Sequence, residues 1–289
     1  MCKWINKVYN YRSFKKLFLQ ITTLQEIILA KIALIGGSGF DDPSILGSIS
    51  SIKMGTPYGS LSSDITIGKV GSIEVALINR HGKGHRIAPS LINNRANIWA
   101  LKEIGTTHII ATTACGSLRQ EIEPGHIVFP DQFIDWTKCR KSSFFEGDQV
   151  AHISMADPFC EKLREILIKT ASELDITHHS NATVITIEGP RFSSRAESRM
   201  FRSFGADIVN MSTVPEVVLA REAGICYASI AMSTDYDSWH VSEAPVTWDM
   251  IVQTMKSNVE RVKQIFFKAI EKVDFDKCYC RTAIESALV

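Results

Sequence analysis

The chain has 289 residues, of which 45% are apolar and 22% are charged, with 32 basic residues against 31 acidic ones. This composition is typical of a folded globular protein, and the net charge of +1 provides no basic field for nucleic acid. No apolar run approaches the ~18–20 residues that a membrane-spanning helix needs. We therefore expect a soluble protein with no nucleic-acid or membrane partner, whose function resides in a binding site.

The first 30 residues form a basic extension. They contain Lys3, Lys7, Arg12, Lys15 and Lys16 but a single acid, Glu26. An organelle-targeting segment, an extra helix, a disordered leader and an upstream start codon are the alternatives for residues 1–30. Residues 31–289 are expected to form one domain, because no linker or internal repeat divides them.

Seven cysteines lie at positions 2, 115, 139, 160, 226, 278 and 280. Their odd number and their scatter through apolar segments indicate thiols in a reducing compartment, and therefore a cytoplasmic location. The Cys278-Tyr-Cys280 pair is a weak metal signal, because a tetrahedral site needs further ligands and none is close in the sequence. We expect structural cysteines, free or paired, and no metal.

Strands and helices alternate along the chain. Strands are expected at 31–35, 73–78, 108–113, 127–129, 183–187, 207–211 and 226–232, and helices at about 91–104, 158–174, 194–204, 214–223 and 247–273. This order predicts an α/β fold, a single domain with a central mixed, mainly parallel sheet flanked by helices.

Polar residues follow several of the strands, at the edge where open α/β sheets bind ligands. Ser38 lies in a glycine-rich turn that fails the dinucleotide fingerprint, because Asp42 stands where the third glycine is needed. Arg80 and His81 offer donors for phosphate oxygens, and hydroxyl groups gather in the segment 112–117. Tight turns, a solvated basic loop and helix caps are the alternatives for these motifs.

Two carboxylates, Asp235 and Asp237, follow a nearly all-apolar strand. Residues two apart in an extended chain point the same way, so both can face one ligand. A buried carboxyl group that keeps its proton can act as an acid, whereas an Asx turn is the alternative. Phe192 and Met211, near two further strand ends, suit either the core or an apolar wall of the site.

Several long segments together resemble the methylthioadenosine phosphorylase branch of the trimeric purine nucleoside phosphorylase family. The resemblance covers about residues 31–255 and is carried by IGGSGFDDP (35–43), RHGKGH (80–85), ANIWALKEIG (96–105), TTACGSL (112–118), TIEGPRFSSRAE (186–197) and NMSTVPEVVLAREAGICYASIAMSTDYD (210–237). It implies cleavage of S-methyl-5′-thioadenosine by inorganic phosphate, which yields adenine and 5-methylthio-α-D-ribose 1-phosphate. A purine nucleoside or methylthioinosine phosphorylase with broader use of 6-oxopurines is the alternative.

The resemblance also implies roles for individual residues. Asp235 would protonate purine N7, Asp237 would accept from the 6-amino group, Met211 would pack on the ribose and Phe192 near the base. His152 would enter the 5′ pocket of a neighbouring subunit, in a homotrimer or in a hexamer made of two trimers. Ser193 and Trp248 are expected to affect specificity, Trp248 standing where the family has a small apolar residue. The phosphate would be bound by Ser38, Arg80, His81, Thr113, Ala114 and Ser212, as a co-substrate with no cofactor and no metal.

Overall fold

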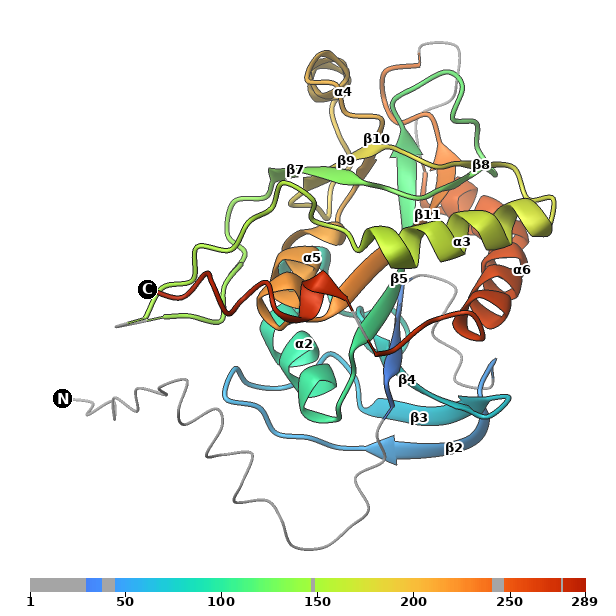
Figure 1. Ribbon diagram of the computed structural model, residues 1–289. Coiled ribbons are helices and arrows are strands. Elements are labelled where there is room, and N and C mark those ends of the chain that lie inside the picture. The colour runs from blue at the N-terminus through green and yellow to red at the C-terminus, as the bar shows by residue number, and fades with distance from the viewer. Residues whose placement is uncertain (1–29, 38–44, 147–148, 241–246, 277) are drawn as a thin grey trace, which may run out of the picture.

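One mixed sheet runs through the computed structural model, which describes residues 30–37, 45–146, 149–240, 247–276 and 278–289 (Figure 1). Within these residues the strands lie in the order β2-β3-β4-β1-β5-β10-β9-β7, and β11 pairs with both β5 and β6, the latter of which pairs with β8. The strands are β1 (Ile32–Gly36), β2 (Gly47–Ile52), β3 (Ile65–Val70), β4 (Ile73–Asn79), β5 (His108–Ser117), β6 (Ile127–Val128), β7 (Gln132–Trp136), β8 (His178–His179), β9 (Thr183–Ile187), β10 (Ile208–Asn210) and β11 (Cys226–Asp235).

The centre of the sheet is parallel. Strand β1 lies parallel to β4 and β5, β11 lies parallel to β5, and β9 lies parallel to β7 and β10. Antiparallel pairs occur at the β2–β3–β4 meander and where β10 meets β5 and β11 meets β6. The expected mixed, mainly parallel sheet is confirmed.

Helices cover both faces of this sheet. They are α2 (Asn94–Glu103), α3 (Glu161–Glu173), α4 (Arg195–Ser203), α5 (Thr213–Glu222) and α6 (Trp248–Ile270), with short 3₁₀ turns at Pro89–Leu91 and Tyr279–Arg281. Figure 1 shows α3 and α6 on one side of the strands and α2 and α5 on the other. None of the helices that the structure describes is both long and apolar enough to span a bilayer.

The residues of β1 show why this strand lies in the middle. Ile32 and Leu34 pack into the core beneath α3 and α6, whereas Ala33 and Ile35 pack into the core beneath α2 and α5. A strand that is buried on both faces needs such a continuous apolar run. A third, smaller apolar cluster lies under α4 and includes Phe201.

Local sequence explains where two of the helices begin. Ser194 is the N-cap of α4, and with Glu197 it forms a reciprocal capping box. Asn93 caps α2 by accepting a hydrogen bond from the backbone N–H of Ala96. Because Ser194 is the cap, its neighbour Ser193 lies outside the helix.

Two expectations about the strands need correction. Strand β5 continues to Ser117, four residues beyond the expected end at 113, because its last residues gain β10 as a new partner. The hydroxyl-rich segment 112–117 therefore lies within a strand and not after it. Strands β2, β3, β7 and β8 were not expected, since their sequences lack a long apolar run.

Candidate active site

A cavity of about 660 Å³ opens where the loops after β1, β4 and β11 meet the second half of β5. It also reaches the loops that follow β9 and β10. The wall residues on which the chemistry depends are Gly37, Arg80, His81, Thr113, Ala114, Gly116, Phe192, Ser193, Asn210, Met211, Ser212, Thr234, Asp235 and Asp237. Polar groups that are far apart in the sequence therefore face one space.

Arg80 brings a buried positive charge to the cavity. Its side chain is 1% exposed, and its Nε and Nη2 each donate to a carboxylate oxygen of Glu216 at 2.8 Å. Nη1 donates to the backbone oxygen of Thr112 at 3.0 Å. A guanidinium has five N–H groups, so two of them stay available for an anion in the cavity. The glycine at position 37 is required here, because a Cβ atom would lie 3.0 Å from both Arg80 Nη1 and Thr112 O.

His81 is held as a neutral ring. Its Nδ1 lies 2.8 Å from the carbonyl oxygen of Ile87, so Nδ1 must carry the proton and donate. Burial, and next the positive charge of Arg80, lower the pKa of His81 to about 4. Near neutral pH its Nε2 is therefore an acceptor. In this state Nε2 suits the O–H of monohydrogen phosphate, whereas the expected role of His81 as a donor from this atom requires a protonated ring.

Hydroxyl groups line the cavity beside this cationic corner. Thr113 Oγ1 and Ser212 Oγ lie 2.8 Å apart. The side-chain nitrogen of Asn210 donates to Thr113 Oγ1 at 3.3 Å and to Thr213 Oγ1 at 2.7 Å. Thr113 Oγ1 also donates to the backbone oxygen of Ala114 at 3.0 Å, so the two hydroxyl groups must turn from these partners before both can donate to an anion.

Asp235 is the last residue of β11 and is buried. Thr234 Oγ1 donates to its Oδ2 at 2.7 Å, and the backbone N–H of Asp237 donates to its Oδ1 at 2.8 Å. Burial raises the pKa of Asp235 from 3.8 to about 6, assisted by the charge of Asp237 and opposed by these two hydrogen bonds. Such a carboxyl group can release a proton near neutral pH.

Asp237 faces the same cavity but not for the expected reason. Its φ of +46° is left-handed and not extended, and its N–H bonds to Asp235 in the manner of an Asx turn. The Asx turn and two carboxylates that face one cavity, which were given as alternatives, are thus both present. Burial raises the pKa of Asp237, and the nearby hydroxyls of Ser198 and Ser193 oppose this rise. Oδ2 of Asp237 and Oγ of Ser193 are both buried, and neither has a well-aligned hydrogen bond within the described residues. An acceptor and a hydroxyl are therefore ready for a ligand.

The apolar side of the cavity includes Phe192 and Met211. Phe192 is 39% exposed, so part of its ring is accessible to a ligand in the cavity. The loops that carry these residues are joined by Arg140, whose guanidinium donates to the backbone oxygens of Ile187, Glu188, Met211 and Val214. Arg140 also pairs with the side chain of Glu188 at 3.1 Å.

Three expected site residues are not among the residues that line the described cavity. Ser38 lies outside the described residues, and Trp248 begins α6 but its side chain is likewise not described. His152 is exposed and is absent from the cavity wall. Its backbone N–H donates to Ala287 O at 2.8 Å, so it lies beside the C-terminal segment. All the other expected residues meet in the cavity.

Glu216 and Tyr227 were missed in the sequence. The hydroxyl of Tyr227 donates to Glu216 Oε1 at 2.8 Å, so the carboxylate that neutralises Arg80 is itself fixed. A signal was present, because Glu216 is an acid within the apolar run Val-Pro-Glu-Val-Val-Leu-Ala, and a buried acid needs a cationic partner. Arg140 gave no such signal, since it lies in the polar segment Lys-Cys-Arg-Lys.

Comparison with known proteins agrees with this geometry. Residues 31–271 match the phosphorylase superfamily. A Danio rerio protein named S-methyl-5′-thioadenosine phosphorylase is 52% identical over 248 residues, which cover 84% of this chain and 89% of the relative. A Hyperthermus butylicus protein of the same name is 52% identical over 267 residues, covering 91% and 97%.

Solved structures give the same result. Methylthioadenosine phosphorylase from Schistosoma mansoni in complex with adenine has a TM-score of 0.86 and 40% identity, covering 89% of this chain and 98% of that one. A methylthioadenosine phosphorylase from an antarctic soil metagenomic library has a TM-score of 0.86 and 43% identity, covering 91% and 93%. The chain belongs to the phosphorylase superfamily and, within it, to the methylthioadenosine phosphorylase family.

Proposed function

We propose that the protein cleaves S-methyl-5′-thioadenosine with inorganic phosphate, releasing adenine and 5-methylthio-α-D-ribose 1-phosphate. One observation carries the proposal. A buried carboxyl group with a raised pKa, Asp235, shares a single cavity with the anion-binding groups around Arg80. Relatives with about half of their residues identical bear the name of this activity, which supports the same substrate here.

The phosphate is assigned to the corner formed by Arg80, His81, Thr113, Ala114 and Ser212, with Ser38 as a further donor. The two remaining N–H groups of Arg80 donate to its oxygens, and the hydroxyls of Thr113 and Ser212 do so once they turn from their present partners. Neutral His81 accepts a hydrogen bond from the O–H of the phosphate. The anion would stabilise the cationic ribosyl centre as the glycosidic bond breaks, and then capture C1′ with inversion.

The purine is assigned to the opposite end of the cavity. Asp235 protonates N7, so the leaving group departs as a neutral base, an effect worth ~10²–10⁴-fold in rate. Asp237, whose Oδ2 has no well-aligned partner within the described residues, accepts from the 6-amino group. Ser193 lies beside it as a specificity residue, Phe192 packs near the base and Met211 packs against the ribose.

A phosphorylase for methylthioinosine or other 6-oxopurines is the second candidate. The raised pKa of Asp235 favours it, because a protonated carboxyl group can also donate to an oxygen acceptor. Rates with methylthioadenosine, adenosine, methylthioinosine and guanosine, each with and without phosphate, decide between the two. We expect free adenine only when phosphate is present, and methylthioadenosine to be the best substrate. Faster turnover of the oxopurines would favour the second candidate, and base release without phosphate would overturn both.

We further propose that the active form is a homotrimer, with a hexamer of two trimers as the alternative. His152 is exposed on this chain and available to a neighbouring 5′ pocket, where Trp248 would narrow the space. Light scattering gives the oligomeric state, and His152→Ala should raise KM for methylthioadenosine more than KM for phosphate. The expected cytoplasmic location and the absence of any cofactor from the reaction stay predictions.

A further inference from the structure

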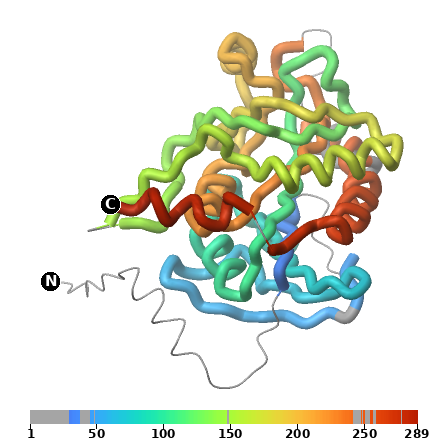
Figure 2. The backbone as a smooth tube through the Cα atoms, in the orientation of Figure 1, coloured from blue at the N-terminus to red at the C-terminus, as the bar shows by residue number. Residues whose placement is uncertain are grey.

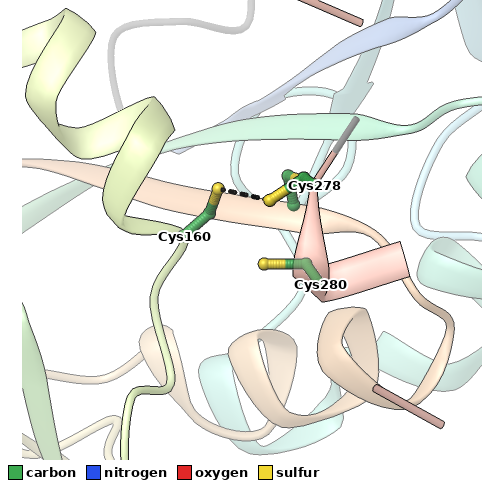
Figure 3. A group of neighbouring side chains, drawn as sticks. Cys160, Cys278 and Cys280 are labelled. Atoms are coloured by element: carbon green, nitrogen blue, oxygen red, sulfur yellow. Dashed lines mark hydrogen bonds between the residues drawn. The ribbon is translucent and has the colours of Figure 1, made fainter. Parts of the chain in front are cut away.

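Four cysteines from three separate parts of the chain lie close together in the folded protein. Cys160 is the N-cap of α3, Cys226 is the first residue of β11, and Cys278 and Cys280 lie in the C-terminal segment. Their four Sγ atoms all lie within 4.8 Å of one another. Figure 3 shows the sulfur atoms of Cys160, Cys278 and Cys280 turned toward one another. The cluster lies outside the candidate active site, whose wall includes none of them.

The spacing of these sulfur atoms suits a tetrahedral ion. A zinc–sulfur bond of about 2.3 Å places the ligands of a four-thiolate site roughly 3.8 Å apart. Cys160 Sγ and Cys278 Sγ are 3.6 Å apart, close to that value. Cys278 has an extended backbone, with φ −145° and ψ 141°, and Cys280 lies in the 3₁₀ turn that follows it. Small side-chain rotations would bring all four sulfurs into contact with one ion.

The surroundings of the cluster match what such an ion needs. Three of the cysteines are buried and Cys278 is half-buried, so the centre is shielded from water while one ligand stays accessible. Cys278 lines a surface hollow together with Lys162 and Arg281, which gives an ion a path from solvent. Arg221 is 5% exposed, and its Nη1 donates to Cys280 Sγ at 3.2 Å. A positive charge at this distance offsets the net negative charge of a zinc–tetrathiolate group.

We propose that Cys160, Cys226, Cys278 and Cys280 form a structural site for one zinc ion. Zinc binding forms four zinc–sulfur bonds, and the four thiol protons leave to solvent. The expectation of no metal rested on the lack of further ligands near the C-x-C pair in the sequence. The fold supplies two, from positions more than fifty residues away along the chain.

Zinc at this position would fasten the C-terminal segment to the body of the protein. Beyond Cys280 this segment pairs with the strand-like stretch around residue 151, through Ala151↔Leu288 and through Val289 N–H to Val150 O at 3.0 Å. Figure 2 shows the end of the chain beside that stretch. The ion thus stabilises an arrangement that α3, β11 and the C-terminus form together, independently of the chemistry in the cavity.

The first test measures metal in the full chain, purified without a histidine tag from zinc-supplemented medium. Elemental analysis should give one zinc ion per chain. After metal exchange, cobalt(II) should show the charge-transfer and d–d absorption of a tetrahedral tetrathiolate site. These measurements use the unaltered protein, so they do not depend on the folding of any variant.

The second test removes one ligand. Cys280→Ser should lower zinc affinity by at least ~tenfold, since even outer groups of metal sites are worth 10–100-fold, and should speed amide exchange at residues 150–152 and 287–289. Cys139→Ser is the matched control, because Cys139 is exposed and outside the cluster. Its zinc content should equal that of the parent.

Thiol titration in denaturant with a chelator and no reductant separates zinc from disulfides. All seven cysteines should react if the cluster binds zinc. Loss of two or four reactive thiols would show disulfides in the cluster and overturn the proposal. A chain that takes up neither zinc nor cobalt while all its thiols react would overturn it as well.

Discussion

Replacing Asp235 by asparagine separates the acid from the rest of the site. Asparagine has the same shape, and its amide can keep contacts with both Thr234 and the N–H of Asp237. It cannot transfer a proton to the leaving purine. We therefore expect kcat to fall ~10²–10⁴-fold, which is about 3–5 kcal/mol of barrier. KM for the nucleoside should change by less than about threefold, because ground-state contacts survive.

The pH profile is the second readout of this variant. With a pKa of about 6 in the folded protein, roughly a tenth of Asp235 carries its proton at pH 7. The kcat/KM of the parent should accordingly decline above pH 6. The variant should lose this decline, because position 235 no longer titrates.

Stability provides an internal check on the same substitution. Burial raises the pKa of Asp235 above its unfolded value of 3.8, so the charged form destabilises the fold. Below pH 3.8 the group is mostly protonated in the folded and the unfolded protein, so it does not lower the free energy of unfolding. As pH rises from 3.8 toward 6 the free energy of unfolding falls, by at most ~3 kcal/mol. Asp235→Asn should thus raise the free energy of unfolding at pH 8 but not at pH 3.5, as urea titrations would measure.

A less active but more stable protein cannot be explained by misfolding. Asp175→Asn is the matched control, since Asp175 is exposed and its φ of +54° suits asparagine equally well. Both its activity and its stability should stay within error of the parent. Turnover of Asp235→Asn within threefold of the parent would refute the role of Asp235 as the acid.

Three further substitutions test an ion pair, a close contact in the site and a buried histidine outside it. Glu216→Gln leaves Arg80 as a buried charge with a weakened partner, so we expect a loss of ~3–5 kcal/mol in thermal unfolding and a raised KM for phosphate. Gly116→Ala places a methyl group 3.0 Å from a carboxylate oxygen of the general acid, and kcat should fall ~10²-fold; Gly55→Ala, with open space around its Cβ, is the silent control. His108, whose pKa burial lowers to about 4, stabilises the fold while neutral and loses this contribution as pH falls from 6.5 toward 4. His108→Gln should therefore show a smaller loss of unfolding free energy over that range in urea titrations than the parent.

The residues proposed as catalytic could be predicted from the sequence because each lies next to an apolar strand. Arg80 and Asp235 directly follow or end apolar strands, and strand ends meet at one edge of a parallel sheet. Strands β2 and β7 could not be predicted in this way. Neither strand has a run of apolar residues: β2 reads Gly-Ser-Ile-Ser-Ser-Ile and β7 reads Gln-Phe-Ile-Asp-Trp. Both are strands because they pair with β3 and β9, respectively.

The same distinction applies to side-chain contacts across long stretches of sequence. The ion pair of Arg80 with Glu216 joins residues 136 positions apart, and Cys160 meets Cys278 across 118 positions. No spacing rule relates such residues, because only the folded sheet brings them together. The residues proposed to react could therefore be predicted from the sequence, whereas the contacts through which Glu216, Tyr227 and Arg140 hold their neighbours in place could not.

The cavity contains several buried polar groups whose hydrogen-bonding capacity the protein leaves unused. Asp235 has a raised pKa, Oδ2 of Asp237 and Oγ of Ser193 are buried without well-aligned hydrogen bonds in the described region, and Arg80 retains spare donors in a buried position. Each of these features destabilises the protein without a ligand. A purine with its ring nitrogens and amino group, together with a phosphate, supplies the complementary partners. Binding energy is therefore concentrated on the groups that also stabilise the transition state, which is the condition for binding to accelerate a reaction.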